Sequence, residues 1–455
     1  MADASSSTSN GLGTARSSVL TPVPAVERIQ SLDVLRGFAV LGILWMNILL
    51  FALPYWAYRN PTVYGGATGI NLAAWLWSDV FVEGKMRAIF SMLFGASLVL
   101  ITSRAEGRGA ADQAADIYLR RTLWLAFFGL LHAYFLWWGD ILFYYGVAGL
   151  GLYPFRRLSP RALFVLGVLV LAVVTPQSIL ETQRRIDLRA QAQVADAAAA
   201  SGEALTEEQL EAQRVWAEAK QEIQPDAGDV AEQIEIHRGS YAEIFAERIA
   251  YVVSAHTIEF YRWMVFDVVG MMLIGMGLMK LGVLSARMSV RAYTGMAVAG
   301  FALCLPVTWL IETRSMARGF DLAQDFFRDS VYDVARLGGA LGYIGLVMLV
   351  CRTGVLPGAR ARLAATGQMA LSNYLMQTLI CTTLFYGYGF GMFGRLERYQ
   401  VLEIAIAIWV FQLWLSPVWL RRFRFGPLEW IWRSLIYWKR QPMRLRAAGA
   451  PLPSS

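Results

Sequence analysis

The chain has 455 residues, of which 56% are hydrophobic and 16% are charged, and its formal net charge at pH 7 is +7. A soluble globular domain does not need so large an apolar fraction. The apolar runs are continuous and about 20 residues long, the length at which an α-helix crosses a bilayer, whereas an outer-membrane barrel shows short stretches of alternating polarity. The sequence therefore predicts an all-α polytopic membrane protein.

The first segment, residues 1–27, is predicted to be a disordered cytoplasmic tail. Ser, Thr, Ala and Gly dominate it, and it has few large apolar side chains to bury. The first apolar run begins near Val34, after a charged motif, and no small-residue cleavage signal follows it. We therefore expect a retained first span and not a removable signal peptide.

Ten stretches are predicted to span the membrane, and the second of them consists of an amphipathic entry helix followed by a helix from about Lys85. They are residues 34–53, 73–102, 122–138, 141–154, 162–180, 262–281, 292–311, 331–351, 366–386 and 400–420. Arginine and lysine gather in alternate loops, which the positive-inside rule assigns to the cytoplasm. Both termini are thus expected to lie in the cytoplasm, and membrane lipids are expected as partners.

One large polar segment, residues 181–248, divides the chain. It has fifteen acidic and seven basic residues, and its composition favours a solvated helical insertion on the periplasmic side. We expect a helical bundle half on each side of it, residues 28–180 and 249–438, and then a basic cytoplasmic tail, residues 439–455. The arginines are split among short loops, which argues against a nucleic-acid-binding face.

A metal centre is not expected. The three cysteines, Cys304, Cys351 and Cys381, lie within or at the edge of apolar runs without paired spacing, and the chain has only three histidines. We also expect no bound cofactor, although an acyl thioester could serve as a donor.

Five ordered strings of this chain closely resemble the YeiB-like family, a bacterial inner-membrane group catalogued as domain of unknown function 418. They are RIQSLDVLRGFAVLGILWMN (28–47), EGKMRAIFSMLFG (83–95), GLLHAYFLWWGDILFYY (129–145), GQMALSNYLMQ (367–377) and GPLEWIWR (426–433). The first string is also similar, more distantly, to the opening of transmembrane acyltransferases. That likeness implies transfer of an acyl group from a cytosolic thioester donor to an envelope acceptor.

The expected base is not where those acyltransferases place it. Asn47 and Gln377 stand at the two positions where many of those enzymes have histidine, and an amide does not take a proton near neutral pH. His132, with Asp140 eight residues later, is the alternative base, because histidine titrates near neutrality. The competing interpretation is that His132 only hydrogen-bonds a neighbouring helix inside a polar bundle core.

Charged residues at two helix entries are candidates for substrate binding. Asp33 and Arg36 are three residues apart and can pair on a helix, yet the guanidinium fork also suits a phosphate or carboxylate. Lys85 and Arg87 could complete an anion site or could pair with Glu83. In each case the alternative is a structural ion pair.

Two further features carry polar side chains. Asn373 and Gln377 share one helix face, where an amide pair usually joins helices by hydrogen bonds, and a substrate contact is the second interpretation. The string at 426–433 is typical of an interfacial amphipathic helix, with Glu429 and Arg433 spaced for an ion pair.

Two classes of function remain open from the sequence. The first is transmembrane acyl transfer with His132 as an essential base. The second is a transporter or flippase of a small anionic or lipid-linked compound, in which Arg36, Asn47 and Gln377 line a path. No convincing repeat relates the two halves of the chain, which weakens the transporter interpretation.

Overall fold

The computed structural model describes residues 28–321 and 326–445, and every named element in these ranges is a helix. Seven helical segments among them are long and apolar enough to cross a membrane. They are Gln30–Ala52, Gly69–Gly107, Pro160–Ala200, Tyr241–Lys280, Val290–Ala317, Phe326–Thr353 and Arg398–Leu420. The predicted all-α multi-span class is therefore confirmed, whereas the number of ten spans and the cytoplasmic termini stay predictions.

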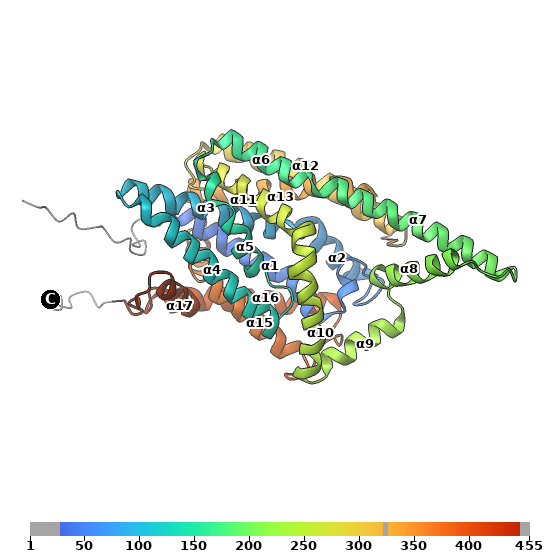
Figure 1. Ribbon diagram of the computed structural model, residues 1–455. Helices are drawn as coiled ribbons and strands as arrows, with labels where there is room; N and C mark the ends of the chain where they lie inside the picture. The colour runs from blue at the N-terminus through green and yellow to red at the C-terminus, as the bar shows by residue number, and fades with distance from the viewer. Residues whose placement is uncertain (1–27, 322–325, 446–455) are drawn as a thin grey trace, which may run out of the picture.

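The helices form one elongated bundle (Figure 1). In chain order they are α1 (Gln30–Ala52), η2 (Tyr55–Tyr58), α2 (Gly69–Phe81), α3 (Lys85–Gly107), α4 (Ala111–Phe135), α5 (Leu142–Leu150), η3 (Tyr153–Arg157), α6 (Pro160–Ala172), α7 (Val174–Ala200), α8 (Glu207–Ile223), α9 (Ala227–Arg238), α10 (Tyr241–Ser254), η4 (Ala255–Met264), α11 (Val265–Lys280), α12 (Val290–Ala317), α13 (Phe326–Thr353), α14 (Pro357–Gln368), α15 (Ala370–Phe385), α16 (Arg398–Leu420) and α17 (Pro427–Ile436).

The interruption predicted near Lys85 is present. Helix α2 ends at Phe81 and α3 begins at Lys85, and Gly84 joins them with a φ of 70°. This left-handed conformation favours glycine. A β-carbon at Gly84 would also meet the side chains of Tyr332 and Arg336, so the break lets α13 pack tightly against the chain.

Helix α5 is shorter than the predicted span 141–154. It has nine residues, which make about 14 Å of helix, against about 30 Å for the hydrocarbon of a bilayer. The preceding helix α4 ends at Phe135, and a turn that includes Gly139 leads into α5. His132 and Asp140 therefore lie on opposite sides of this turn.

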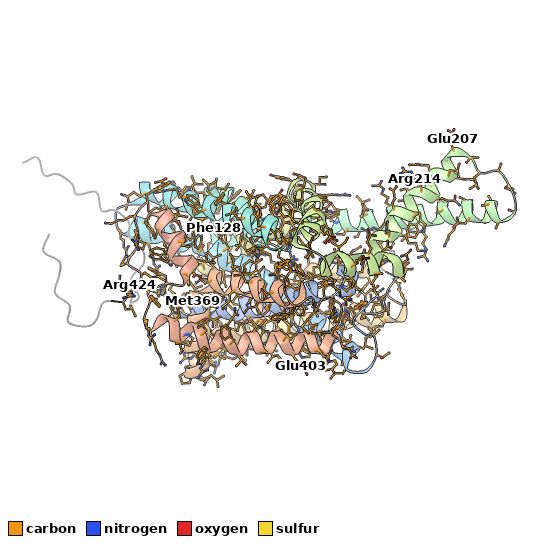
Figure 2. All side chains as sticks on the ribbon, turned by 90° about the horizontal axis from the view of Figure 1, so that it is seen from below. Phe128, Glu207, Arg214, Met369, Glu403 and Arg424 are labelled. Atoms are coloured by element: carbon orange, nitrogen blue, oxygen red, sulfur yellow. The ribbon has the colours of Figure 1, made fainter. Side chains whose placement is uncertain are left out.

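The segment predicted as a polar insertion forms most of α7 and all of α8 and α9, and it projects from the bundle (Figure 1). Figure 2 shows Glu207 and Arg214 on this projection and Arg424 at the opposite end of the molecule. Helix α8 begins with a capping box: the Thr206 hydroxyl accepts from the Gln209 N–H, and the Gln209 side chain accepts from the Thr206 N–H. Such reciprocal bonds satisfy the free donors of a helix start.

Candidate functional site

A hydroxyl, an imidazole and a carboxylate form a continuous chain of hydrogen bonds inside the bundle. His132 on α4 places Nδ1 2.8 Å from Asp140 Oδ1. Its Nε2 lies 2.9 Å from Thr378 Oγ1 on α15. The three side chains are each about 1% exposed. The direct contact between His132 and Asp140, which their spacing alone leaves open, is therefore present.

Asp140 is held in place by a second interaction. Its other carboxylate oxygen accepts the backbone N–H of Phe143 at 2.7 Å, in the first turn of α5. A carboxylate at a helix N-terminus is stabilised by the free N–H groups there. Because an ionised carboxylate can only accept, it favours the tautomer in which His132 Nδ1 carries the proton. Nε2 is then the acceptor, and it faces Thr378.

Aromatic side chains enclose the imidazole. The Tyr374 ring lies 5.1 Å from the ring of His132, and the Trp137 ring lies 6.4 Å away. The Tyr374 hydroxyl donates to the Gly139 carbonyl at 3.5 Å. These groups exclude water from His132, and electrostatic interactions are stronger in such an environment than in water.

A cavity of about 250 Å³ opens at the arginine-rich end of the bundle. Six arginines line it, namely Arg28, Arg36, Arg104, Arg108, Arg121 and Arg433, together with Asp33 and Glu429. Apolar side chains form the remaining wall, among them Val40, Ile43, Phe90, Leu93, Phe94, Leu125, Ile141 and Leu142. Tyr145 and Tyr374 also line the cavity. The cavity therefore combines a cationic rim with an apolar interior.

Both acidic residues at the rim have other partners. Asp33 accepts from Arg36 at 2.9 Å. Glu429 does not form the expected pair with Arg433: one of its oxygens accepts the backbone N–H groups of Leu371 and Ser372, at 2.7 and 3.0 Å. These N–H groups belong to the first turn of α15, so Glu429 stabilises the start of that helix.

Two of the rim arginines lie against aromatic rings. The guanidinium of Arg121 is 4.4 Å from the ring centre of Trp432, and that of Arg433 is 4.8 Å from the ring centre of Phe425. Within the described residues, neither forms an ion pair with a carboxylate, and Arg121 Nε is buried without a hydrogen-bond partner. Burial and the positive charge of Arg28 lower the pKa of Arg433. An anion in the cavity would relieve this unbalanced positive charge.

Tyr374 connects the two features, because it lines the cavity and also packs on His132. Arg121 and His132 are both on α4, eleven residues apart, which corresponds to about 16 Å along the helix. The imidazole thus lies beyond the inner end of the cavity, behind the Tyr374 ring.

The predicted substrate residues Asn373 and Gln377 lie in an amide network between α15 and α16. Asn373 Nδ2 donates to Thr366 O and Ser416 Oγ, at 3.0 and 3.1 Å. Gln377 Nε2 donates to Gln412 Oε1 at 2.8 Å, and Gln412 in turn donates to the Asn373 carbonyl at 2.9 Å. Both residues are buried. These contacts are those of the first interpretation, in which amides join helices.

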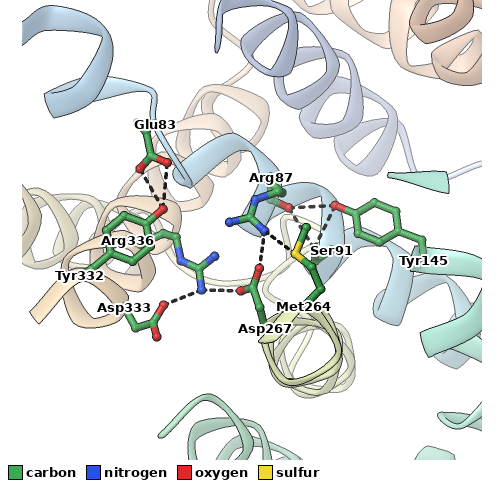
Figure 3. Close-up of polar contacts among 9 residues, drawn as sticks. All are labelled: Glu83, Arg87, Ser91, Tyr145, Met264, Asp267, Tyr332, Asp333 and Arg336. Carbon is green, nitrogen blue, oxygen red and sulfur yellow. Dashed lines mark hydrogen bonds and ion pairs between the residues drawn. The ribbon is translucent and has the colours of Figure 1, made fainter. Parts of the chain in front are cut away.

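The predicted residue Arg87 lies in a different polar cluster, shown in Figure 3, and Lys85 begins the same helix, α3. Arg87 contacts Asp267 at 2.5 Å, and Asp267 also pairs with Arg336. Lys85 is buried, and its Nζ donates to the backbone carbonyl of Asp79 at 2.8 Å. Neither residue lines the cavity.

Within this cluster, Glu83 does not pair with Lys85 or Arg87. Its two oxygens accept from the Tyr332 hydroxyl at 2.9 and 3.0 Å. Arg336 extends the cluster to Asp333 at 2.6 Å (Figure 3). Alternating charges of this kind offset the cost of burying each ion.

Asn47 stands apart from the other predicted residues. It is half-buried on α1 and does not line the cavity. The structure thus brings His132 and Asp140 together, and separately Asp33 and Arg36, whereas Lys85, Arg87, Asn373 and Gln377 lie in other polar networks.

Sequence reasoning missed Thr378, Tyr374, Arg121 and Arg433. Thr378 directly follows the quoted string 367–377, and Tyr374 lies inside it, but neither residue type stands out in an apolar helix. Arg121 resembles any other loop arginine, and Arg433 suggested a pair with Glu429. Only the packing of α17 against α4, through a hydrogen bond from Trp432 to the Arg121 carbonyl, brings the two arginines to one cavity.

Comparisons with known proteins agree with the motifs. A family model described as "Protein of unknown function (DUF418)" matches residues 278–439. The chain is 32% identical to "Uncharacterized protein YeiB" of Escherichia coli strain K12 over 436 residues, which cover 93% of this chain and 98% of that protein. The chain belongs to the YeiB-like DUF418 family. No solved structure matches it.

A second family member shows how far this likeness extends. "Uncharacterized protein YxaH" of Bacillus subtilis strain 168 is 28% identical over 449 residues, which cover 94% of this chain and 98% of that protein. The similarity therefore includes the helices that hold His132 and Thr378 as well as those around the cavity.

Proposed function

We propose that this multi-pass membrane protein transfers an acyl group from a thioester donor to an envelope acceptor, with His132 as the general base. The observation that carries the proposal is the buried chain Thr378–His132–Asp140. An oriented imidazole with a carboxylate on its far nitrogen recurs in acyl-transfer sites on unrelated folds. The distant resemblance to transmembrane acyltransferases supports the same reaction class.

The chemistry follows from the two ring nitrogens. His132 Nε2 would remove the proton from a hydroxyl of the acceptor while its oxygen attacks the thioester carbonyl. The carbon–sulfur bond then breaks, and the imidazolium returns the proton to the thiolate that leaves. Asp140 stabilises the transient imidazolium and keeps the ring in orientation. Thr378 fills the position at Nε2 where the hydroxyl of the acceptor would bind.

The proposed topology gives the two ends of the bundle different roles. We assign the bacterial inner membrane, cytoplasmic termini and a periplasmic projection of α7 to α9, because the arginines gather at one end of the bundle and the acidic segment lies at the other. Asp33 and Arg36 then lie where an anionic lipid would arrive from the cytoplasm.

The second candidate, transport of an anionic or lipid-linked compound, has less support. Its path would include Arg36, Asn47 and Gln377. Gln377 is bonded to Gln412, and neither Asn47 nor Gln377 lines the cavity.

Mass spectrometry of envelope lipids, glycans and small molecules tests the proposal in cells. A deletion strain is complemented with the wild type, with His132→Gln or with His237→Gln. His237 is the matched control, because it is a buried histidine on another helix, α9. We expect an acyl modification that is lost in the deletion and in His132→Gln but present with His237→Gln. Unchanged acylation with an unmodified compound on one side of the membrane would favour transport.

A further inference from the structure

We infer that the arginine-rimmed cavity binds a lipid that has a phosphate head group and one hydrocarbon chain. The inference goes beyond the proposed acyl transfer, because it assigns a class of ligand to the cavity, and the Tyr374 ring separates this cavity from His132. Lipid binding and acyl transfer can fail independently, since binding is measured without any reaction.

The rim supplies the site for the head group. Two of the six arginines there, Arg121 and Arg433, supply the positive charge, and the two acids of the rim are already bonded to Arg36 and to the start of α15. Arg121 and Arg433 face the cavity without a carboxylate partner among the described residues. A guanidinium offers a planar fork of donors that matches phosphate oxygens. Two such forks suit a doubly charged phosphate monoester better than a single carboxylate.

The wall below the rim supplies the site for the chain. Its polar groups are few and already bonded: Ser97 Oγ donates to the Phe94 carbonyl, and Tyr145 shares a hydrogen bond with Ser91. The amides of a pantetheine arm would lose their hydrogen bonds in such a cavity, which is unfavourable. A hydrocarbon chain needs no partners and gains from leaving water.

The size of the cavity limits the number of chains. Its volume of about 250 Å³ is close to the lower limit of about 300 Å³ for ligand pockets. This favours one chain over the two chains of an ordinary phospholipid. The ring of Tyr374 lies at the far wall and would set the length of the chain that fits.

Binding to the purified full-length protein in an uncharged detergent tests the inference. The probes are dodecyl phosphate, inorganic phosphate, dodecyltrimethylammonium and coenzyme A. We expect dodecyl phosphate to bind, and each of the others to bind at least about tenfold more weakly, because only dodecyl phosphate has both the anion and the chain. Coenzyme A that binds as tightly as dodecyl phosphate, or a cationic probe that does so, would overturn the inference.

Variants connect the binding to the named residues. Arg121→Gln and Arg433→Gln should each weaken dodecyl phosphate binding about tenfold, whereas Arg422→Gln, an exposed arginine at the same end, should not change it. In Leu93→Phe the larger side chain occupies part of the apolar interior of the cavity, so that less space remains for the hydrocarbon chain. The binding preference should therefore move from dodecyl phosphate toward octyl phosphate. A misfolded variant would lose binding of both dodecyl and octyl phosphate and would not show this change of preference. Unchanged affinity in both arginine variants would contradict the assignment.

Two further probes distinguish the sources of such a lipid. Lysophosphatidic acid represents glycerol-based membrane lipids, and farnesyl phosphate represents isoprenoid carriers. Preferential binding of one of these two lipids identifies the source. If neither lipid binds and dodecyl phosphate does not bind either, the inference is overturned. His132→Gln should leave all these affinities unchanged, so that failure of acyl transfer and failure of lipid binding are distinguishable.

Discussion

Gly367 on α14 packs directly on the backbone of Asp33 on α1, so that two motifs from opposite ends of the chain touch. A β-carbon at Gly367 would overlap the Asp33 carbonyl, and one at Gly37 would overlap the Leu363 carbonyl. This close crossing brings Arg28 to Gln368, where the two side chains hydrogen-bond. The side of the rim that includes Arg28, Asp33 and Arg36 is therefore built at the contact between α1 and α14.

The first prediction concerns this crossing. Gly37→Ala should lower the apparent melting temperature of the detergent-purified protein strongly, because the new methyl group meets backbone that cannot move aside. Overpacking of this kind costs about 1–3 kcal/mol or more. Gly295→Ala is the matched control, since a β-carbon there meets nothing within 4 Å. Equal melting temperatures for both variants would show that the crossing is looser than described.

The second prediction concerns the buried ion-pair cluster. Asp267→Asn leaves Arg87 and Arg336 without the carboxylate that joins them, and removal of one partner from a buried pair costs about 3–5 kcal/mol. The measurement is thermal unfolding of the purified protein. Glu211→Gln, which breaks an exposed pair with Arg214, should leave the melting temperature nearly unchanged. A small effect of Asp267→Asn would mean that water or ions reach the cluster.

The third prediction concerns His237 on α9 and its pH dependence. Burial, together with the charge of Arg248, lowers the pKa of His237 from 6.5 to about 4, although a hydrogen bond to the Gln233 carbonyl opposes this. The folded state therefore binds fewer protons than the unfolded state between these values. Stability is complete above pH 6.5 and is lost as the pH falls toward 4, by up to roughly 3 kcal/mol.

Hydrogen–deuterium exchange of α9 between pH 7 and pH 4.5 measures this dependence, after correction for the intrinsic effect of pH. His237→Gln should reduce the difference, because glutamine does not titrate. Equal pH dependence in the wild type and the variant would contradict the prediction.

The fourth prediction distinguishes a structural amide from a substrate contact at Gln377. Gln377→Leu leaves Gln412 without its donor and should destabilise the protein by about 1–3 kcal/mol. The double variant Gln377→Leu, Gln412→Leu removes both groups, so it should recover part of that loss in thermal unfolding. A loss of activity in the double variant at full stability would instead support contact with substrate.

The sequence predicts the helical membrane class and the break near Lys85, because apolar run length and glycine position are local properties. It does not predict that α5 is only half the length of a span, since the residues after the turn at Gly139 remain apolar whether they cross the membrane or not. The sequence also predicts the helical segment that projects as α7 to α9, because its many charged residues favour solvent and its capping residues mark helix starts.

The candidate site is only partly predictable. His132 and Asp140 stand out because ionisable residues are costly inside a membrane. Thr378 and the arginines of the cavity acquire their roles only through contacts between helices far apart in the chain. Lys85 and Arg87 look like an anion site in the sequence, yet a backbone carbonyl and Asp267 bind them, and neither partner is adjacent in sequence.

The most direct test is the transfer of isotopically labelled acyl groups in inverted inner-membrane vesicles. Vesicles with the wild-type protein and with His237→Gln should label an envelope acceptor, and those with His132→Gln should lose labelling by at least about 10²-fold, the usual contribution of a general base. Asp140→Asn should also reduce labelling, because the ring would lose its orientation. Undiminished labelling with His132→Gln, at equal protein levels, would contradict the proposed role of His132.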